Sequence, residues 1–74
     1  MDIVEYKLLY ELVQEADKLL THEYLLTKIW GADYRDETRY LRVCIARVRK
    51  KLEISEGIGY IQTIPTVGYR MVGS

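Results

Sequence analysis

The 74-residue sequence contains one cysteine, one proline, one histidine and no phenylalanine. Cys44 has no second cysteine for a disulfide, and without Cys and His partners at ligand spacing it cannot build a zinc site. No apolar run approaches the roughly 20 residues of a membrane span, and no signal-peptide pattern precedes the first charged residues. These absences predict a single cytoplasmic domain, residues 1–74, that binds no metal, no cofactor and no membrane.

The residues that catalysis needs are also scarce. His22 is the only histidine, and sequence spacing connects it to no nucleophile or carboxylate constellation. Gly57 and Gly59 precede a predicted strand and not a helix, so they do not form a phosphate-binding loop. We therefore exclude an enzyme at this point.

The formal net charge of zero hides an uneven distribution. The first seventeen residues hold five acids and one lysine, whereas residues 39–51 hold six basic residues and no acid. A one-sided basic surface attracts phosphate even at zero net charge, because local charge acts within about 8 Å at physiological salt. Taken alone, such a run is more often a solvated helix face.

Two helices are predicted in the first half of the chain. Asp2 and Glu5 resemble a capping box at the start of a helix over residues 2–17. Residues 18–21 form a brief extended link, Thr21 caps a second helix from His22 to about Trp30, and Gly31 ends it. Apolar residues at helical spacing predict the buried faces: Leu8, Leu9, Leu12, Val13 and Ala16 in the first helix, and Leu25, Leu26, Ile29 and Trp30 in the second.

A third helix and two strands follow. Residues 32–38 read as a connecting loop whose Asp36 or Thr38 caps a helix that continues to about Glu53. Ser55, Gly57 and Gly59 break that pattern, and residues 60–64 and 69–72 have strand character on either side of a tip at residues 65–68. Three helices followed by a β-hairpin predict an α+β winged helix-turn-helix, in which the hairpin is the wing.

The third helix has two opposite faces at 100° per residue. Its core-facing stripe consists of Leu41, Cys44, Ile45, Val48 and Leu52, so the Cys44 thiol is a packing group. The outward face consists of Arg39, Val43, Ala46, Lys50 and, somewhat to one side, Arg47. Arg42 and Arg49 lie on one shoulder and Lys51 on the other.

This outward face suits the major groove of DNA. Val43 and Ala46 provide a small centre that can approach base edges and touch a thymine methyl, while the surrounding cations reach phosphates. Arg47 is long and planar enough for bidentate contact with guanine. A solubilising face would mix Glu with Lys and would gain nothing from an exposed Val and Ala. The pattern therefore favours a DNA-recognition helix over a solvated face.

Four segments together resemble the DNA-binding effector domain of OmpR/PhoB-type response regulators, over nearly the whole chain. They are Glu5-Tyr-Lys-Leu-Leu9, Leu25-Leu-Thr-Lys-Ile-Trp-Gly31, residues 39–52, and Thr63-Ile-Pro-Thr-Val-Gly-Tyr-Arg70. Within that family, Tyr40-Leu-Arg-Val43 and the Ile64–Met71 wing look most like the KdpE branch, which regulates potassium-transport genes.

The resemblance implies a transcription factor of a two-component system that binds direct-repeat half-sites as a homodimer. It implies base contact by Arg47, Val43 and Ala46, and phosphate contact by Arg39, Arg42, Lys50 and Thr63, with Trp30 and Tyr69 as further backbone contacts. For Trp30 and Tyr69, packing in the core or hairpin is an equal alternative. The acidic loop with Asp33, Asp36 and Glu37 is a possible RNA polymerase contact by the same resemblance, and a solvated loop with a helix cap is its alternative.

The sequence departs from the family in three ways. Pro65 stands where the wing often has an arginine, so minor-groove contact at that position is in question. Cys44 replaces a histidine that is common in the third helix. In the family, a receiver domain with a phosphorylated Asp and a small antiparallel sheet precede the first helix. Neither has a counterpart in these residues, so we expect an isolated or truncated effector domain. The competing function is a winged-helix module whose basic face binds an acidic protein.

Overall fold

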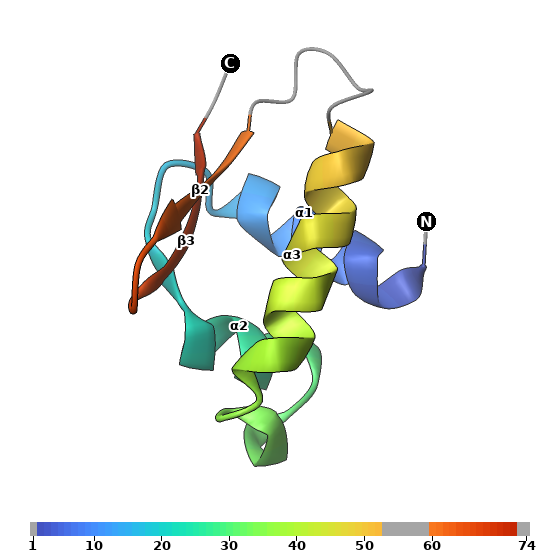
Figure 1. Ribbon diagram of the computed structural model, residues 1–74, viewed down its shortest axis with the longest axis vertical. Coiled ribbons are helices and arrows are strands. Elements are labelled where there is room, and N and C mark those ends of the chain that lie inside the picture. Colours follow the sequence, from blue (N-terminus) through green and yellow to red (C-terminus); the bar gives the residue numbers. More distant parts are fainter. Residues whose placement is uncertain (1, 53–59, 73–74) are drawn as a thin grey trace.

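The computed structural model describes residues 2–52 and 60–72. Its elements follow the chain in the order α1 (Ile3–Gln14), β1 (Leu20–Thr21), α2 (His22–Ile29), the 3-10 turn η1 (Ala32–Tyr34), α3 (Thr38–Leu52), β2 (Tyr60–Ile64) and β3 (Gly68–Val72). In Figure 1, α3 crosses in front of α1, and the hairpin of β2 and β3 stands beside them. The predicted three helices with a C-terminal hairpin are confirmed.

Helix α1 begins where the capping pattern predicts but ends earlier. Asp2 Oδ1 accepts a hydrogen bond from the Val4 amide at 2.8 Å, which satisfies one free N–H of the first turn. The helix ends at Gln14, so Ala16 lies outside it and is exposed. Val13 is 47% exposed because it lies about 100° around the helix from the buried Leu12. The prediction that Val13 and Ala16 are buried was wrong, and two carboxylates, Glu5 and Glu11, are buried in this face instead.

Residues 18–21 do more than link two helices. Leu20 and Thr21 form β1, which pairs antiparallel with β3 and completes a three-stranded sheet of order β1-β3-β2. Thr21 lies opposite Gly68, where an added Cβ would come within 2.0 Å of the Leu20 carbonyl oxygen, so this close pairing needs glycine. A strand of two residues is too short for an alternating pattern to reveal it.

The predicted limits of α2 are confirmed. Thr21 Oγ1 accepts a hydrogen bond from the Tyr24 amide at 3.0 Å. At the other end Gly31 adopts φ 113°, a conformation that favours glycine, and its amide donates to the Thr27 carbonyl at 3.0 Å. The turn between α2 and α3 is therefore specified locally at both ends of α2.

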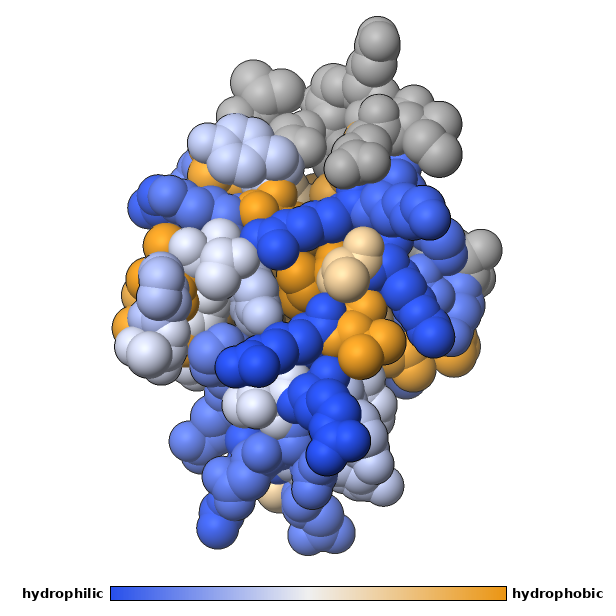
Figure 2. Space-filling model, in the orientation of Figure 1, coloured by the Kyte–Doolittle hydropathy of each residue, from blue (hydrophilic) through white to orange (hydrophobic). Residues whose placement is uncertain are grey.

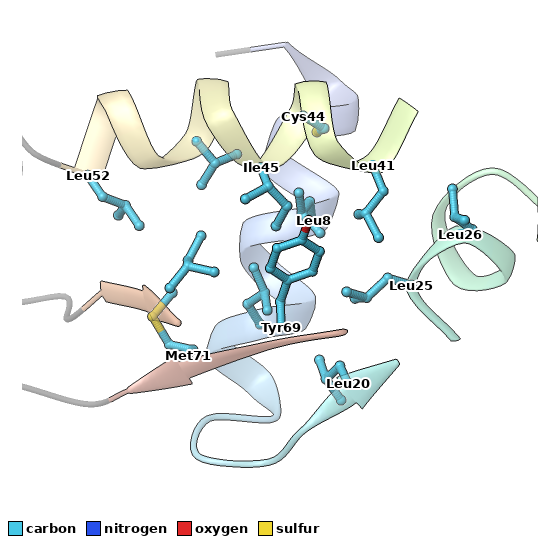
Figure 3. Close-up of a cluster of buried hydrophobic side chains, with 13 residues drawn as sticks. Leu8, Leu20, Leu25, Leu26, Leu41, Cys44, Ile45, Leu52, Tyr69 and Met71 are labelled. Atoms are coloured by element: carbon cyan, nitrogen blue, oxygen red, sulfur yellow. The ribbon is translucent and has the colours of Figure 1, made fainter. Parts of the chain in front are cut away.

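One hydrophobic core joins all three helices to the sheet, and Figure 3 shows α1, α2, α3 and β3 converging on it. The predicted stripe of α3 is confirmed, since all five of its residues are buried. The core consists of Leu8, Leu12, Leu20, Leu25, Leu26, Leu41, Cys44, Ile45, Val48, Leu52, Ile61, Tyr69 and Met71. Glu53 and the predicted helix breakers Ser55, Gly57 and Gly59 lie outside the described residues. No helix within the described ranges is long and apolar enough to cross a membrane.

Candidate nucleic-acid interface

The outward face of α3 is as exposed as its angular pattern predicts. Val43, at 46% exposure, and Ala46 form a small apolar centre. Figure 2 views this side and shows strongly hydrophilic side chains around a small hydrophobic area over α3. The basic side chains of this face, all exposed, are Arg39, Arg42, Arg47 and Lys50.

These four cations form no ion pair with any residue that the structure describes. Within residues 2–52 and 60–72, the only ion pairs are Lys18 with Glu15 and Lys51 with Glu5. Helix α3 itself contains no acidic residue. The outward face therefore presents uncompensated positive charge that anionic groups can approach without displacing a protein carboxylate.

The other two cations of the segment turn inward. Lys51 Nζ lies 2.6 Å from Glu5 Oε1, a carboxylate whose side chain is 6% exposed. The Arg49 guanidinium donates from Nη2 to the Ile61 carbonyl and to the Thr63 hydroxyl of β2. Lys51 thus joins α3 to α1, and Arg49 joins α3 to the hairpin.

A groove of about 470 Å³ separates α3 from the hairpin. Its helix side includes Arg42, Ala46 and Arg49, and its hairpin side includes Thr63 and Thr66. Thr66, at the tip, has φ 63°, a strained conformation for a β-branched residue. The tip turn is closed by the Val67 amide, which donates to the Ile64 carbonyl at 3.1 Å.

Arg70 lies in β3, as the sequence predicts, and it does not line the groove between α3 and the hairpin. It lies opposite Gln62 in the register, and its Nε donates to Gln62 Oε1 at 3.1 Å. Thr63 pairs with Tyr69 on the other face of the hairpin, and both line the groove.

Of the two aromatic residues predicted to contact the DNA backbone, Tyr69 is buried and Trp30 is half-buried. Tyr69 is 5% exposed; its ring lies edge-on to His22 at 5.4 Å and under the Arg49 guanidinium at 5.9 Å. Trp30 is half-buried at the end of α2, and its ring centre lies 6.4 Å from that of Tyr40. Packing explains Tyr69 well, and DNA contact by either residue stays a prediction.

The acidic residues before α3 are exposed and separate from the core. Asp33 lies in η1, and Asp36 and Glu37 precede the first turn of α3. The Glu37 amide donates to the Tyr34 carbonyl at 2.9 Å, and the Glu37 carbonyl accepts from the Tyr40 amide at 3.1 Å. This segment is an ordered, negatively charged corner beside the basic face.

Two polar contacts of α1 that bury its carboxylates were missed by sequence reasoning. Besides the pair of Glu5 with Lys51, Glu11 Oε1 accepts a hydrogen bond of 2.5 Å from the Tyr24 hydroxyl. That bond to a carboxylate, aided by desolvation, raises the pKa of Tyr24 to about 12. The spacings of 46 and 13 residues carry no local signal that pattern reading can find.

The described residues offer little for other chemistry. They contain no group of three or more His, Cys, Asp or Glu side chains arranged to hold a metal ion. Burial, followed by the negative charges of Glu5 and Asp2, raises the pKa of the Cys44 thiol to about 11, so it is protonated and unreactive near neutral pH.

Comparison with known proteins gives a consistent result. Residues 3–71 match the family model described as "Transcriptional regulatory protein, C terminal". The response regulator SaeR of Staphylococcus epidermidis is 35% identical over 71 residues, covering 95% of this chain and 31% of SaeR. The chain spans about a third of the length of the curated relatives it matches.

Two solved domains share the fold. The C-terminal domain of the nisin resistance regulator NsrR, a lantibiotic response regulator, superposes with a TM-score of 0.79 at 31% identity, covering all of this chain and 75% of that one. The C-terminal DNA-binding domain of RstA from Klebsiella pneumoniae superposes with a TM-score of 0.78 at 30% identity, covering 97% of this chain and 66% of that one. Both likenesses confirm the winged-helix architecture.

Proposed function

This chain belongs to the family of C-terminal domains of transcriptional regulatory proteins, and we propose that it binds double-stranded DNA sequence-specifically. In this role α3 enters the major groove and the β2–β3 hairpin lies near the minor groove. The observation that carries the proposal is the outward face of α3, where unpaired Arg39, Arg42, Arg47 and Lys50 surround the small Val43 and Ala46 centre. The shape and charge of that face match what groove binding requires.

The proposal assigns two kinds of contact. Arg47, with Val43 and Ala46, reads base edges, because these residues lie near the centre of the outward face. Arg39, Arg42, Lys50 and Thr63 contact phosphates on either side, with Trp30 and Tyr69 as further backbone contacts. No catalytic role is proposed, since His22 packs against Tyr69 and the Cys44 thiol is buried.

The wider setting follows from the relatives. We propose that the chain is the effector part of a two-component response regulator that binds direct repeats in promoters as a homodimer, which requires a cytoplasmic location. The exposed Asp33, Asp36 and Glu37 are the proposed contact with RNA polymerase. The likeness to the KdpE branch stays a prediction, which enrichment of potassium-transport promoters from genomic DNA would support.

A selection of binding sites from random duplexes, performed with the 74-residue chain at two salt concentrations, tests the proposal. We expect one enriched motif and an affinity that falls steeply with salt as counterions are released. Binding that enriches no motif and ignores salt would count against DNA recognition. Salt-sensitive binding to an acidic protein, with no duplex affinity, would favour the protein-interaction module instead.

Two matched variants separate base contact from phosphate contact. Arg47→Ala should cost about 1 to 3 kcal/mol of binding free energy and relax base preference at one position of the motif. Lys50→Ala should weaken binding to all sequences alike and reduce the salt slope by about one unit. Equal losses for Arg47→Ala on the selected site and on random DNA would rule out its base-reading role.

A further inference from the structure

Arg49 lies on the flank of α3 that faces the hairpin, and its guanidinium contacts both hairpin strands. From Nη2 it donates to the Ile61 carbonyl at 2.9 Å and to the Thr63 hydroxyl at 2.5 Å, both on β2. Its Cζ lies 5.9 Å from the centre of the Tyr69 ring on β3. Thr63 and Tyr69 are directly opposed in the register, so one side chain holds a cross-strand pair against α3.

The contacts of Arg49 with β2 lie at the point along the strand where its side chains stop packing into the hydrophobic core. Ile61 and Met71 are paired at the base of the hairpin and are buried in the core. Two residues towards the tip, Thr63 faces the same side as Ile61 but is exposed, as are the tip residues 65–67. On the β3 side the tip is held by the main chain, because the His22 amide donates to the Val67 carbonyl at 3.1 Å. On the β2 side, the hydrogen bonds from Arg49 connect the hairpin to α3.

Arg49 also orients the Thr63 hydroxyl. A hydroxyl has one donor hydrogen and acceptor lone pairs, and here a lone pair accepts from Arg49. The hydroxyl hydrogen is thereby left to point away from the guanidinium. Thr63 is exposed and lines the groove between α3 and the hairpin, so this hydrogen is available to an acceptor in that groove, such as a phosphate oxygen.

We infer that Arg49 is a positioning residue for DNA recognition, which fixes the hairpin against α3 and presents Thr63, and is not itself a base or phosphate contact. The inference rests on the proposed function. A protein that binds two grooves of DNA at once gains affinity when its two binding elements, here α3 and the hairpin, are fixed relative to each other before binding. Less conformational entropy is then lost when the complex forms. Arg49 supplies that spacing through two hydrogen bonds and a ring contact.

Hydrogen exchange of the free chain tests the positioning without DNA. Arg49→Lys keeps the positive charge but loses the planar guanidinium that makes both hydrogen bonds and the contact with the Tyr69 ring. We expect faster exchange of amides in residues 60–64, with protection in the cores of α1 and α3 unchanged. Arg42→Lys is the matched control, because it makes the same change seven residues earlier on a side chain that is exposed and unpaired in the structure, and it should leave hairpin exchange as it was. Equal exchange in both variants would overturn the inference.

Binding measurements test the consequence for DNA. Arg49→Lys should lower affinity for the selected site about tenfold, the size of one lost charged hydrogen bond, while the salt slope stays unchanged. Hydroxyl-radical footprinting should show lost protection at the minor groove, whereas dimethyl sulfate footprinting should show retained protection of guanine N7 in the major groove. A slope reduced by about one unit, or equal loss of both footprints, would overturn positioning.

A double-mutant cycle isolates the role of Thr63. If Arg49 acts through Thr63, the double variant that carries both Arg49→Lys and Thr63→Val should bind DNA no more weakly than the single variant with the lower affinity. Losses that simply multiply would contradict the coupling. An unaltered chain that binds no duplex would overturn the proposed function and this inference with it. A binding chain whose Arg49→Lys variant binds equally well would overturn this inference alone.

Discussion

The two flanks of α3 hold the helix in place by different chemistry. Towards the hairpin, Arg49 binds a carbonyl and a hydroxyl, both neutral acceptors, so its positive charge remains uncompensated. Towards α1, Lys51 binds the carboxylate of Glu5, so its charge is cancelled at close range. Two cations only two residues apart thus contribute unequally to the basic face, and a count of basic residues in the segment overstates the charge offered to DNA.

The flanks differ also in what depends on them. The hairpin flank is half-exposed and borders the groove of the candidate interface, so its disruption should change binding. The α1 flank contains a carboxylate that is almost fully buried, so its disruption should change folding. Variants of the α1 flank test whether stability and DNA affinity separate in this way.

The largest expected effect in this flank is that of Lys51→Met. The change leaves the Glu5 carboxylate buried without its partner, which should lower the free energy of unfolding by about 1 to 3 kcal/mol. Urea unfolding followed by Trp30 fluorescence measures it. Lys50→Met is the control: that side chain is exposed and unpaired, so its stability cost should be within about 0.5 kcal/mol while the salt slope of DNA binding falls. Equal stability losses in the two variants would contradict the comparison.

A smaller effect is expected for Glu5→Gln. The amide oxygen can still accept from Lys51, and the partly exposed lysine can turn to solvent, so the loss should be about 1 kcal/mol or less. Because Lys51 borders the same surface as Arg47 and Lys50, its uncancelled charge should strengthen binding to random DNA at low salt. Glu15→Gln makes the same charge change beside Lys18, beyond the end of α1. Similar gains for both variants would mean that net charge, and not the release of Lys51, is responsible.

Much of the fold and of the outward face could be predicted because it is specified locally. The angular order of residues 39–52 sorts buried from exposed side chains, and Thr21 and Gly31 mark the ends of α2. The partners of Glu5, Glu11 and Arg49 could not be predicted, since each lies on another element at least 12 residues away. Strand β1 was missed for a related reason: its pairing depends on Gly68 of β3, and two residues carry no pattern of their own.

The smallest expected effect belongs to the second carboxylate of α1, whose partner is neutral. Tyr24 donates to Glu11, and its pKa is raised to about 12 from 10 in the unfolded chain. Because the folded pKa is the higher one, its stabilisation is present below pH 10 and is lost as pH rises from 10 towards 12. Tyr24 is 38% exposed, so solvent screening keeps this contribution small. Tyr24→Phe should therefore flatten the fall of the urea midpoint between pH 9.5 and about 11. Tyr10→Phe, an exposed tyrosine of α1, is the control, and an identical flattening there would assign the alkaline effect to tyrosines in general and not to the Glu11 bond.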